Sequence, residues 1–98
     1  MAITVVLTET RPNTGVAFHE GSAEFLAFLK EAKDSGKIIE SDENGFLDNE
    51  KLTRSYTFTF PIDEDYVPFR DSIKCVEYDK SRDDYNEKNN IEQTIDIT

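Results

Sequence analysis

The order of patterned segments constrains the fold of this chain more than any single residue does. In chain order, the segments are a strand at 3–10, a helix at 22–36, strands at 37–47 and 51–60, a helical region at 63–88 and a strand at 91–98. The strands are identified by alternation of apolar and polar residues, and the helices by a repeat near 3.6 residues. The sequence therefore predicts one α+β domain over residues 1–98, with the order βαββαβ.

Local signals place the helix ends. Ser22 is suited to cap the first helix, and Gly36 suits the left-handed position after its end. In the second helical region, one continuous helix would be apolar on two opposite sides. We therefore predict a break near residues 71–72, where Ser72 or Asp71 caps the longer helix that follows. Pro68 supports the break, because proline disfavours helical backbone at the residue before it.

The hairpin between the second and third strands is predicted to turn at Asp48-Asn49-Glu50. A turn at Asn44-Gly45 would leave a strand running on to Phe60, longer than strands usually are. Asn44-Gly45 is therefore predicted to be a bulge or bend within the second strand.

The two faces of the predicted four-stranded antiparallel sheet differ in composition. Both helices of a βαββαβ domain cover one face, and the aliphatic and aromatic strand residues belong beneath them. The remaining residues define a threonine-rich face, which is either solvated or packed against a second copy. It consists of Thr4, Val6, Thr8, Thr10, Thr53, Ser55, Thr57, Thr59 and Thr94.

The charge of the chain argues against nucleic-acid binding. The formal net charge is −10, and the acidic excess is spread over both halves, so there is no basic patch or tail. Affinity for phosphate backbones comes mainly from Lys and Arg. RNA-recognition modules share this topology, and Arg54-Ser55-Tyr56-Thr57-Phe58 resembles their third-strand motif. That role would need Tyr56 and Phe58 on the open face, whereas the pattern predicts them in the core.

The remaining composition indicates an intracellular protein. Cys75 is the only cysteine, which excludes an intrachain disulfide and predicts a small buried apolar residue. The apolar run at residues 3–7 is too short to span a membrane and lacks a preceding basic residue, so no signal peptide is expected. We expect a cytoplasmic location, or the host cytoplasm if the protein is viral.

The order and length of the segments resemble small ferredoxin-like domains of the dimeric α+β-barrel type, which include the antibiotic-biosynthesis-monooxygenase family. The resemblance covers nearly the whole chain and rests on topology. It implies a homodimer in which the uncovered sheet faces of two subunits meet. Enzymes of that family usually have a more apolar ligand cavity. This chain departs from them, because it has no Trp and only one histidine. It also resembles small uncharacterised proteins of marine bacteriophages.

Three residues are candidates for ligand binding. Arg54 lies in the aromatic phase of the third strand, where an unpaired charge would be unfavourable. It is predicted either to extend to solvent or pair with a carboxylate such as Glu40 or Asp42 on the neighbouring strand, or to bind an anion together with His19 and Tyr56. His19 titrates near neutral pH in principle, although a lone loop histidine is usually exposed and without a role.

No metal site or cofactor is predicted. The acidic loop from Asp42 to Glu50 does not match an EF-hand, and the acidic residues between Asp79 and Glu87 alternate with basic ones along a helix. The leading prediction is thus a non-enzymatic protein that acts by homodimerisation or protein association. The alternative is a ligand-binding protein or monooxygenase-like enzyme of the dimeric α+β-barrel class.

Overall fold

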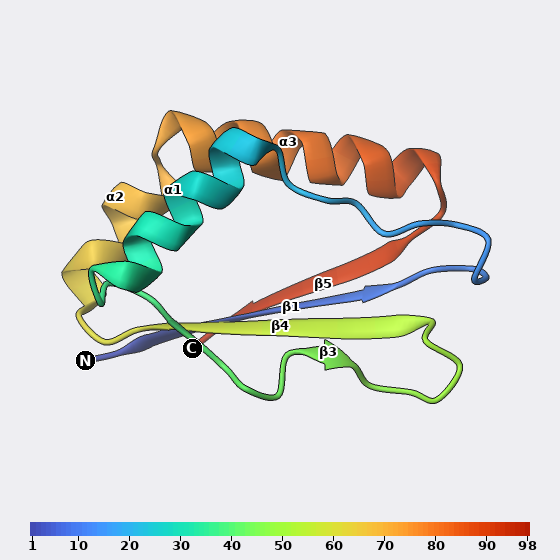
Figure 1. Cartoon of the computed structure of the whole chain (residues 1–98), viewed down its shortest axis with the longest axis horizontal. Coiled ribbons are helices and arrows are strands. Elements are labelled where there is room, and N and C mark those ends of the chain that lie inside the picture. The colour runs from blue at the N-terminus through green and yellow to red at the C-terminus, as the bar shows by residue number, and fades with distance from the viewer.

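The computed structural model describes all residues from 1 to 98 and has an α+β architecture, with its helices stacked over one antiparallel sheet (Figure 1). The elements are β1 (Ile3–Thr10), α1 (Ala23–Asp34), β2 (Ile39–Glu40), β3 (Gly45–Phe46), β4 (Thr53–Phe60), the 3-10 turn η1 (Asp63–Asp65), α2 (Tyr66–Arg70), α3 (Ile73–Lys88) and β5 (Glu92–Ile97). None of the helices has the length and apolar character needed to cross a bilayer.

The sheet has the strand order β2-β4-β1-β5, and β3 pairs with β4 beside β2. All its pairings are antiparallel. Ile3 lies opposite Phe60 and Glu9 opposite Arg54, which sets the register of the two central strands. Residues at alternate positions then face the helices, so the predicted aromatic line of β4 lies on the covered side.

The predicted second strand is split into β2 and β3, so the sheet has five strands where four were predicted. Asn44 causes the split. Its side-chain oxygen accepts a hydrogen bond from the Thr57 amide at 2.7 Å, and its amide group donates to the Thr57 carbonyl at 3.3 Å. The Asn44 side chain takes the place of a backbone partner for the Thr57 amide, and Gly45 follows with a φ of 144°. The predicted bend at Asn44-Gly45 is confirmed.

The hairpin turns where the sequence predicts. The Asp48 carboxylate accepts hydrogen bonds from the backbone amides of Leu52 and Thr53, at 3.0 and 3.2 Å. Lys51 adopts a positive φ of 60° within this turn. These contacts delay the start of β4 to Thr53, two residues later than the predicted start at 51.

The helix ends also follow the predicted signals. The Ser22 hydroxyl accepts the Phe25 amide at 3.1 Å, and Gly36 has a φ of 79° after α1. The break between α2 and α3 falls at Asp71 and Ser72, and the Ser72 hydroxyl accepts the Cys75 amide at 3.3 Å. Side-chain caps of this kind satisfy amides that have no partner within the helix.

The apolar core lies at one end of the sheet. Ala32, Ile38 and Phe60 are buried together. The Phe60 ring packs edge-on against Tyr66 and Phe69, at centroid distances of 5.2 and 5.4 Å. This core joins α1 and α2 to the ends of β1 and β4, whereas the other face of the sheet carries no helix (Figure 1).

Cys75 lies on the buried side of α3 and is 8% exposed. The prediction of a small buried residue is confirmed. Burial, together with the nearby negative charge of Asp79, raises the pKa of the Cys75 thiol to about 11. The thiol therefore stays protonated near neutral pH, which makes it a poor nucleophile.

We predict that Phe60→Ala lowers the free energy of unfolding by about 3–5 kcal/mol, because it leaves a cavity in the core. Phe46→Ala is the matched control, since Phe46 is 49% exposed and should lose clearly less. Urea unfolding followed by circular dichroism measures both. Equal losses would contradict a core centred on Phe60.

Candidate functional site

A buried ion pair lies at the end of the covered sheet face opposite the apolar core. Glu9 on β1 and Arg54 on β4 face each other, and the Glu9 side chain has no exposed surface. Arg54 Nε donates to Glu9 Oε1 at 3.0 Å, and Arg54 Nη2 lies 2.9 Å from the same oxygen. Such a pair is held by geometry and further hydrogen bonds, because burial removes the hydration of both charges.

Asn86 of α3 supplies the second half of this network. Its amide nitrogen donates to Glu9 Oε2 at 2.8 Å and to the Gln93 side-chain oxygen on β5 at 2.7 Å. Gln93 Nε2 in turn donates to Asp83 Oδ1 at 2.7 Å. The network therefore links α3 to β1 and β5, and through Arg54 to β4.

The structure brings Arg54, His19 and Tyr56 together, with Arg54 at the centre. Arg54 Nη2 donates to the His19 backbone carbonyl at 2.9 Å, and Nη1 lies 3.4 Å from the Tyr56 hydroxyl. Its guanidinium carbon lies 4.3 Å from the centroid of the Phe18 ring. Every guanidinium nitrogen thus has a partner, so an incoming anion would have to compete with Glu9.

Arg54 pairs with a carboxylate, as one prediction held, but the partner is Glu9 and not Glu40 or Asp42. Glu40 accepts a hydrogen bond from Lys33 of α1 at 2.9 Å, and Asp42 lies exposed in the loop between β2 and β3. The physical reason is the register of the central strands. It places Glu9 directly opposite Arg54 on the covered face, closer than any carboxylate of the β2 side.

His19 is half-buried, which corrects the prediction of an exposed loop histidine. Its ring lies between Tyr78 and Tyr85, at centroid distances of 5.4 and 5.5 Å. Nε2 is 3.0 Å from the Ser81 hydroxyl, whereas Nδ1 is buried without a partner. Burial lowers the pKa of His19 more than the Glu9 carboxylate raises it, so the neutral ring is favoured.

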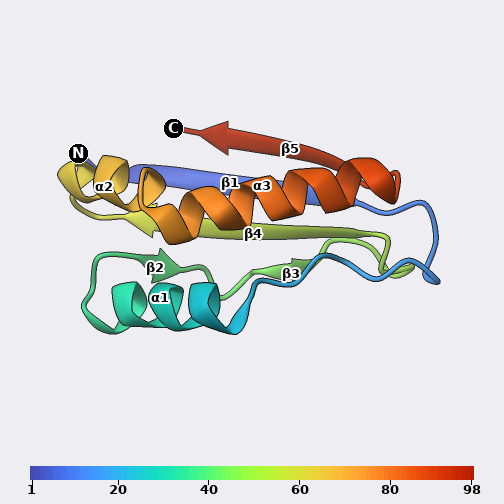
Figure 2. The ribbon, with the colours of Figure 1, turned by 90° about the horizontal axis from the view of Figure 1, so that it is seen from above.

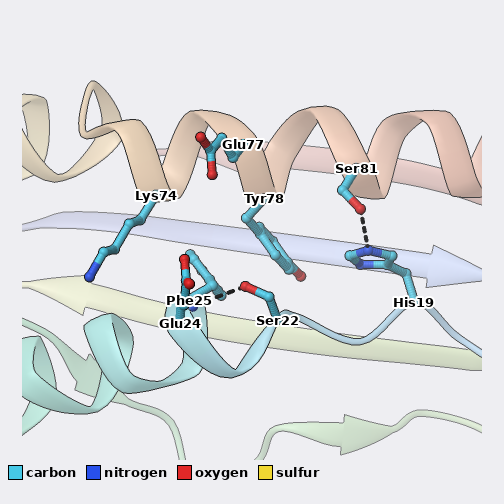
Figure 3. Close-up of a pocket in the computed structure, with 8 residues that line it drawn as sticks. All are labelled: His19, Ser22, Glu24, Phe25, Lys74, Glu77, Tyr78 and Ser81. Atoms are coloured by element: carbon cyan, nitrogen blue, oxygen red, sulfur yellow. Dashed lines mark hydrogen bonds between the residues drawn. The ribbon is translucent and has the colours of Figure 1, made fainter.

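A shallow groove of about 230 Å³ runs from His19 between the start of α1 and α3 (Figure 3). It is lined by His19, Ser22, Glu24, Phe25, Lys74, Glu77, Tyr78 and Ser81. Phe25 and Tyr78, which stack at a centroid distance of 4.0 Å, are its two hydrophobic lining residues. The groove is small beside the roughly 300–1,000 Å³ typical of ligand pockets.

The hydrogen bond between His19 and Ser81 resembles the base and nucleophile of a hydrolase, and sequence reasoning missed it. A working pair also needs a group that orients the base and donors for the developing oxyanion. Here Nδ1 has no orienting partner. Ser81 lies within α3, where backbone amides are used by the helix itself. The structure therefore supplies the histidine–serine hydrogen bond of such a hydrolase, but neither the orienting group nor the oxyanion donors.

The acidic segments considered as metal sites do not converge. No group of three or more His, Cys, Asp or Glu side chains is arranged to hold a metal ion. Asp48 accepts backbone amides of its own turn. Asp79 and Asp83 both pair with Arg82, with nitrogen–oxygen distances of 3.2 Å.

The threonine-rich face lies on the side of the sheet away from the helices. Thr4 faces Thr59 with 3.4 Å between hydroxyls, and Thr10 faces Thr53 at 3.0 Å. No charged residue of β1 or β4 points to this side. On β5, Glu92 and Asp96 point to this side.

The sequence matches no protein-family model, no curated protein and no solved structure at a significant level. The resemblance to dimeric α+β-barrel proteins and to phage proteins therefore stays a prediction.

We predict that Arg54→Met lowers the free energy of unfolding by about 3–5 kcal/mol, because Glu9 would remain buried without its counter-charge. The double variant Glu9→Leu and Arg54→Met should recover most of that loss, since no charge is then left unpaired. Chemical denaturation of the three proteins tests this. Additive losses in the double variant would show that the pair is not coupled.

The lowered pKa of His19 predicts a loss of stability on acidification. The unfolded histidine, with a pKa of about 6.5, takes up a proton that the folded ring resists, so stability falls as pH drops below about 6.5. In His19→Gln this component should disappear. Unfolding free energies between about pH 5 and pH 7.5 measure it, and identical pH profiles would contradict the assignment.

Proposed function

We propose that this protein is a ferredoxin-like domain that acts by homodimerisation or wider protein association, and that it carries out no reaction of its own. The proposal places the dimer contact on the threonine-rich face. A cytoplasmic location, in a host cell if the protein is viral, belongs to the same proposal.

The order of the elements supports the ferredoxin-like assignment if β2 and β3 are counted as two halves of one strand that is interrupted at Asn44. The order then becomes strand, helix, strand, strand, helix, strand, with α2 and α3 as one broken helical region. The helices lie on one side of the sheet in both views (Figures 1 and 2). A sheet covered on one side leaves the other side for water or for a partner.

The observation that carries the dimer proposal is the absence of charge on the outer side of the central strands. A third of the chain is charged, yet β1 and β4 present only threonine, serine and valine there. Ile39 extends the surface with a side chain that is 57% exposed. A twofold dimer presents the same patch from each subunit, so an uncharged patch avoids placing like charges together.

A ligand-binding or monooxygenase-like role is the second proposal. The groove beside His19 favours it, because the groove is next to the cluster that contains Arg54 and Tyr56. Two observations weigh against it. Arg54 is already engaged by Glu9, and the groove is small and lined mainly by polar residues.

We predict that sedimentation and light scattering show a dimer at protein concentrations on the order of tens of micromolar. Thr57→Glu should shift it to monomer, because Thr57 lies opposite Val6 at the centre of the threonine-rich face. Thr14→Glu makes the same change in an exposed loop and should leave the dimer intact. A monomeric wild-type protein, or equal effects of both variants, would overturn this proposal.

A further inference from the structure

The strand β5 forms an edge of the sheet with no neighbour on its outer side (Figure 2). Thr98 and Thr4 exchange two backbone hydrogen bonds, at 2.9 and 3.1 Å. In an antiparallel ladder, this exchange recurs at every second residue. The backbone groups of Thr94 and Asp96 are therefore directed to β1. Those of Gln93, Ile95 and Ile97 are directed outward and have no strand to pair with.

This edge is the one suited to accept another strand. The opposite edge consists of β2 and β3, which are two residues each and are separated by the bend at Asn44. β5 has six residues, with neither proline nor glycine. Among the usual protections of an exposed edge, β5 carries charged side chains, Glu92 and Asp96, but it has no lysine, no proline and no shortened length.

Apolar side chains beside this edge are exposed on the helix-bearing side. Ile95 is 45% and Ile97 52% exposed, although both share the side on which Gln93 contacts α3. The Asp83 carboxylate accepts a hydrogen bond from the Gln93 side chain, so the side of α3 that carries Asp83 faces β5. An added strand would find the exposed side chains of Ile95 and Ile97 here.

The face of β5 that points away from the helices is acidic. Glu92 and Asp96 alternate with Thr94 on the same side as the threonine-rich face, and β5 contains no Lys or Arg. The net charge of −10 adds attraction for a basic partner at longer range. A second copy of β5 at this edge would instead bring another Glu92 and Asp96 close to the first pair, which like-charge repulsion opposes.

We propose that the β5 edge binds an extended segment of another protein as an added antiparallel strand. The segment alternates aliphatic residues, which pack on Ile95 and Ile97, with Lys or Arg residues, which face Glu92 and Asp96. Main-chain hydrogen bonds supply affinity and the alternating side chains supply selectivity, as in other cases of strand addition. This inference concerns the β5 edge and the dimer proposal concerns the sheet face, although Glu92 and Asp96 border both.

The probe is a capped peptide, Lys-Val-Lys-Val-Lys-Val-Lys, with a fluorescein label, titrated against the full chain by fluorescence anisotropy. Its valines would lie opposite the outward-directed residues of β5 and donate their amides to them. N-methylation of the valines should weaken binding at least tenfold, since three hydrogen bonds are lost at about 0.5–1.5 kcal/mol each. N-methylation of lysines leaves those amides intact and should change binding little.

Protein variants test the charge and the location. Asp96→Lys should weaken peptide binding several-fold, whereas Asp42→Lys makes the same change near the opposite edge and should not. Thr57→Glu should retain binding even if it disrupts a dimer. In hydrogen-exchange NMR, the peptide should slow the amides of Ile95 and Ile97, while Thr94 and Asp96 are slow from the start.

Three results would overturn the proposal. Equal binding of the two N-methylated peptides would indicate charge attraction alone. Unchanged exchange at Ile95 and Ile97 with the peptide bound would place it elsewhere. Slow exchange at both amides in the protein alone, relieved by dilution, would show that a second copy occupies the edge.

Discussion

The ion pair between Glu9 and Arg54 is the interaction on which the arrangement of this sheet depends. A one-residue slip between β1 and β4 would turn Glu9 to the open face and leave Arg54 beneath the helices without a counter-charge. The apolar residues nearer the core also favour this register, but aliphatic contacts can be rearranged to suit another one. A buried charge pair tolerates only one register, because each alternative leaves an uncompensated charge.

The pair also divides the covered side of the sheet into two regions with different physics. At one end, α1 and α2 pack on Phe60 through apolar contacts. At the other end, α3 is held by directional hydrogen bonds from Asn86. α3 leaves part of β5 uncovered, and Ile95 and Ile97 are half-exposed.

The surfaces with unused binding capacity are the threonine-rich face and the β5 edge, not the cluster around Arg54. In that cluster nearly every polar group is already paired, and the orphan groups Asn86 Oδ1 and His19 Nδ1 are buried. A catalytic site needs convergent groups that are free to meet a substrate. Saturated internal bonding around Arg54 is one reason why we propose association and not ligand binding at this cluster.

The sequence by itself determined the elements and most of their ends. Alternation predicted β1, β4 and β5, and the caps at Ser22 and Ser72 are local interactions that the sequence encodes within a few residues. Local bonding also decided the bend at Asn44 and the turn at Asp48. The alternation likewise assigned the threonine-rich face and the aromatic face, because side-chain direction in a strand follows from position alone.

Only the tertiary structure decided which distant residues meet. Glu9 shares the phase of Ile3, Val5 and Leu7, so an acid in an aliphatic line was a signal that could have been matched with Arg54. The match requires the strand order and register, which depend on the summed packing of the whole sheet. Asn86 carried no sequence signal, because a polar residue on a polar helix is ordinary. Its burial arises only from where α3 crosses β1 and β5.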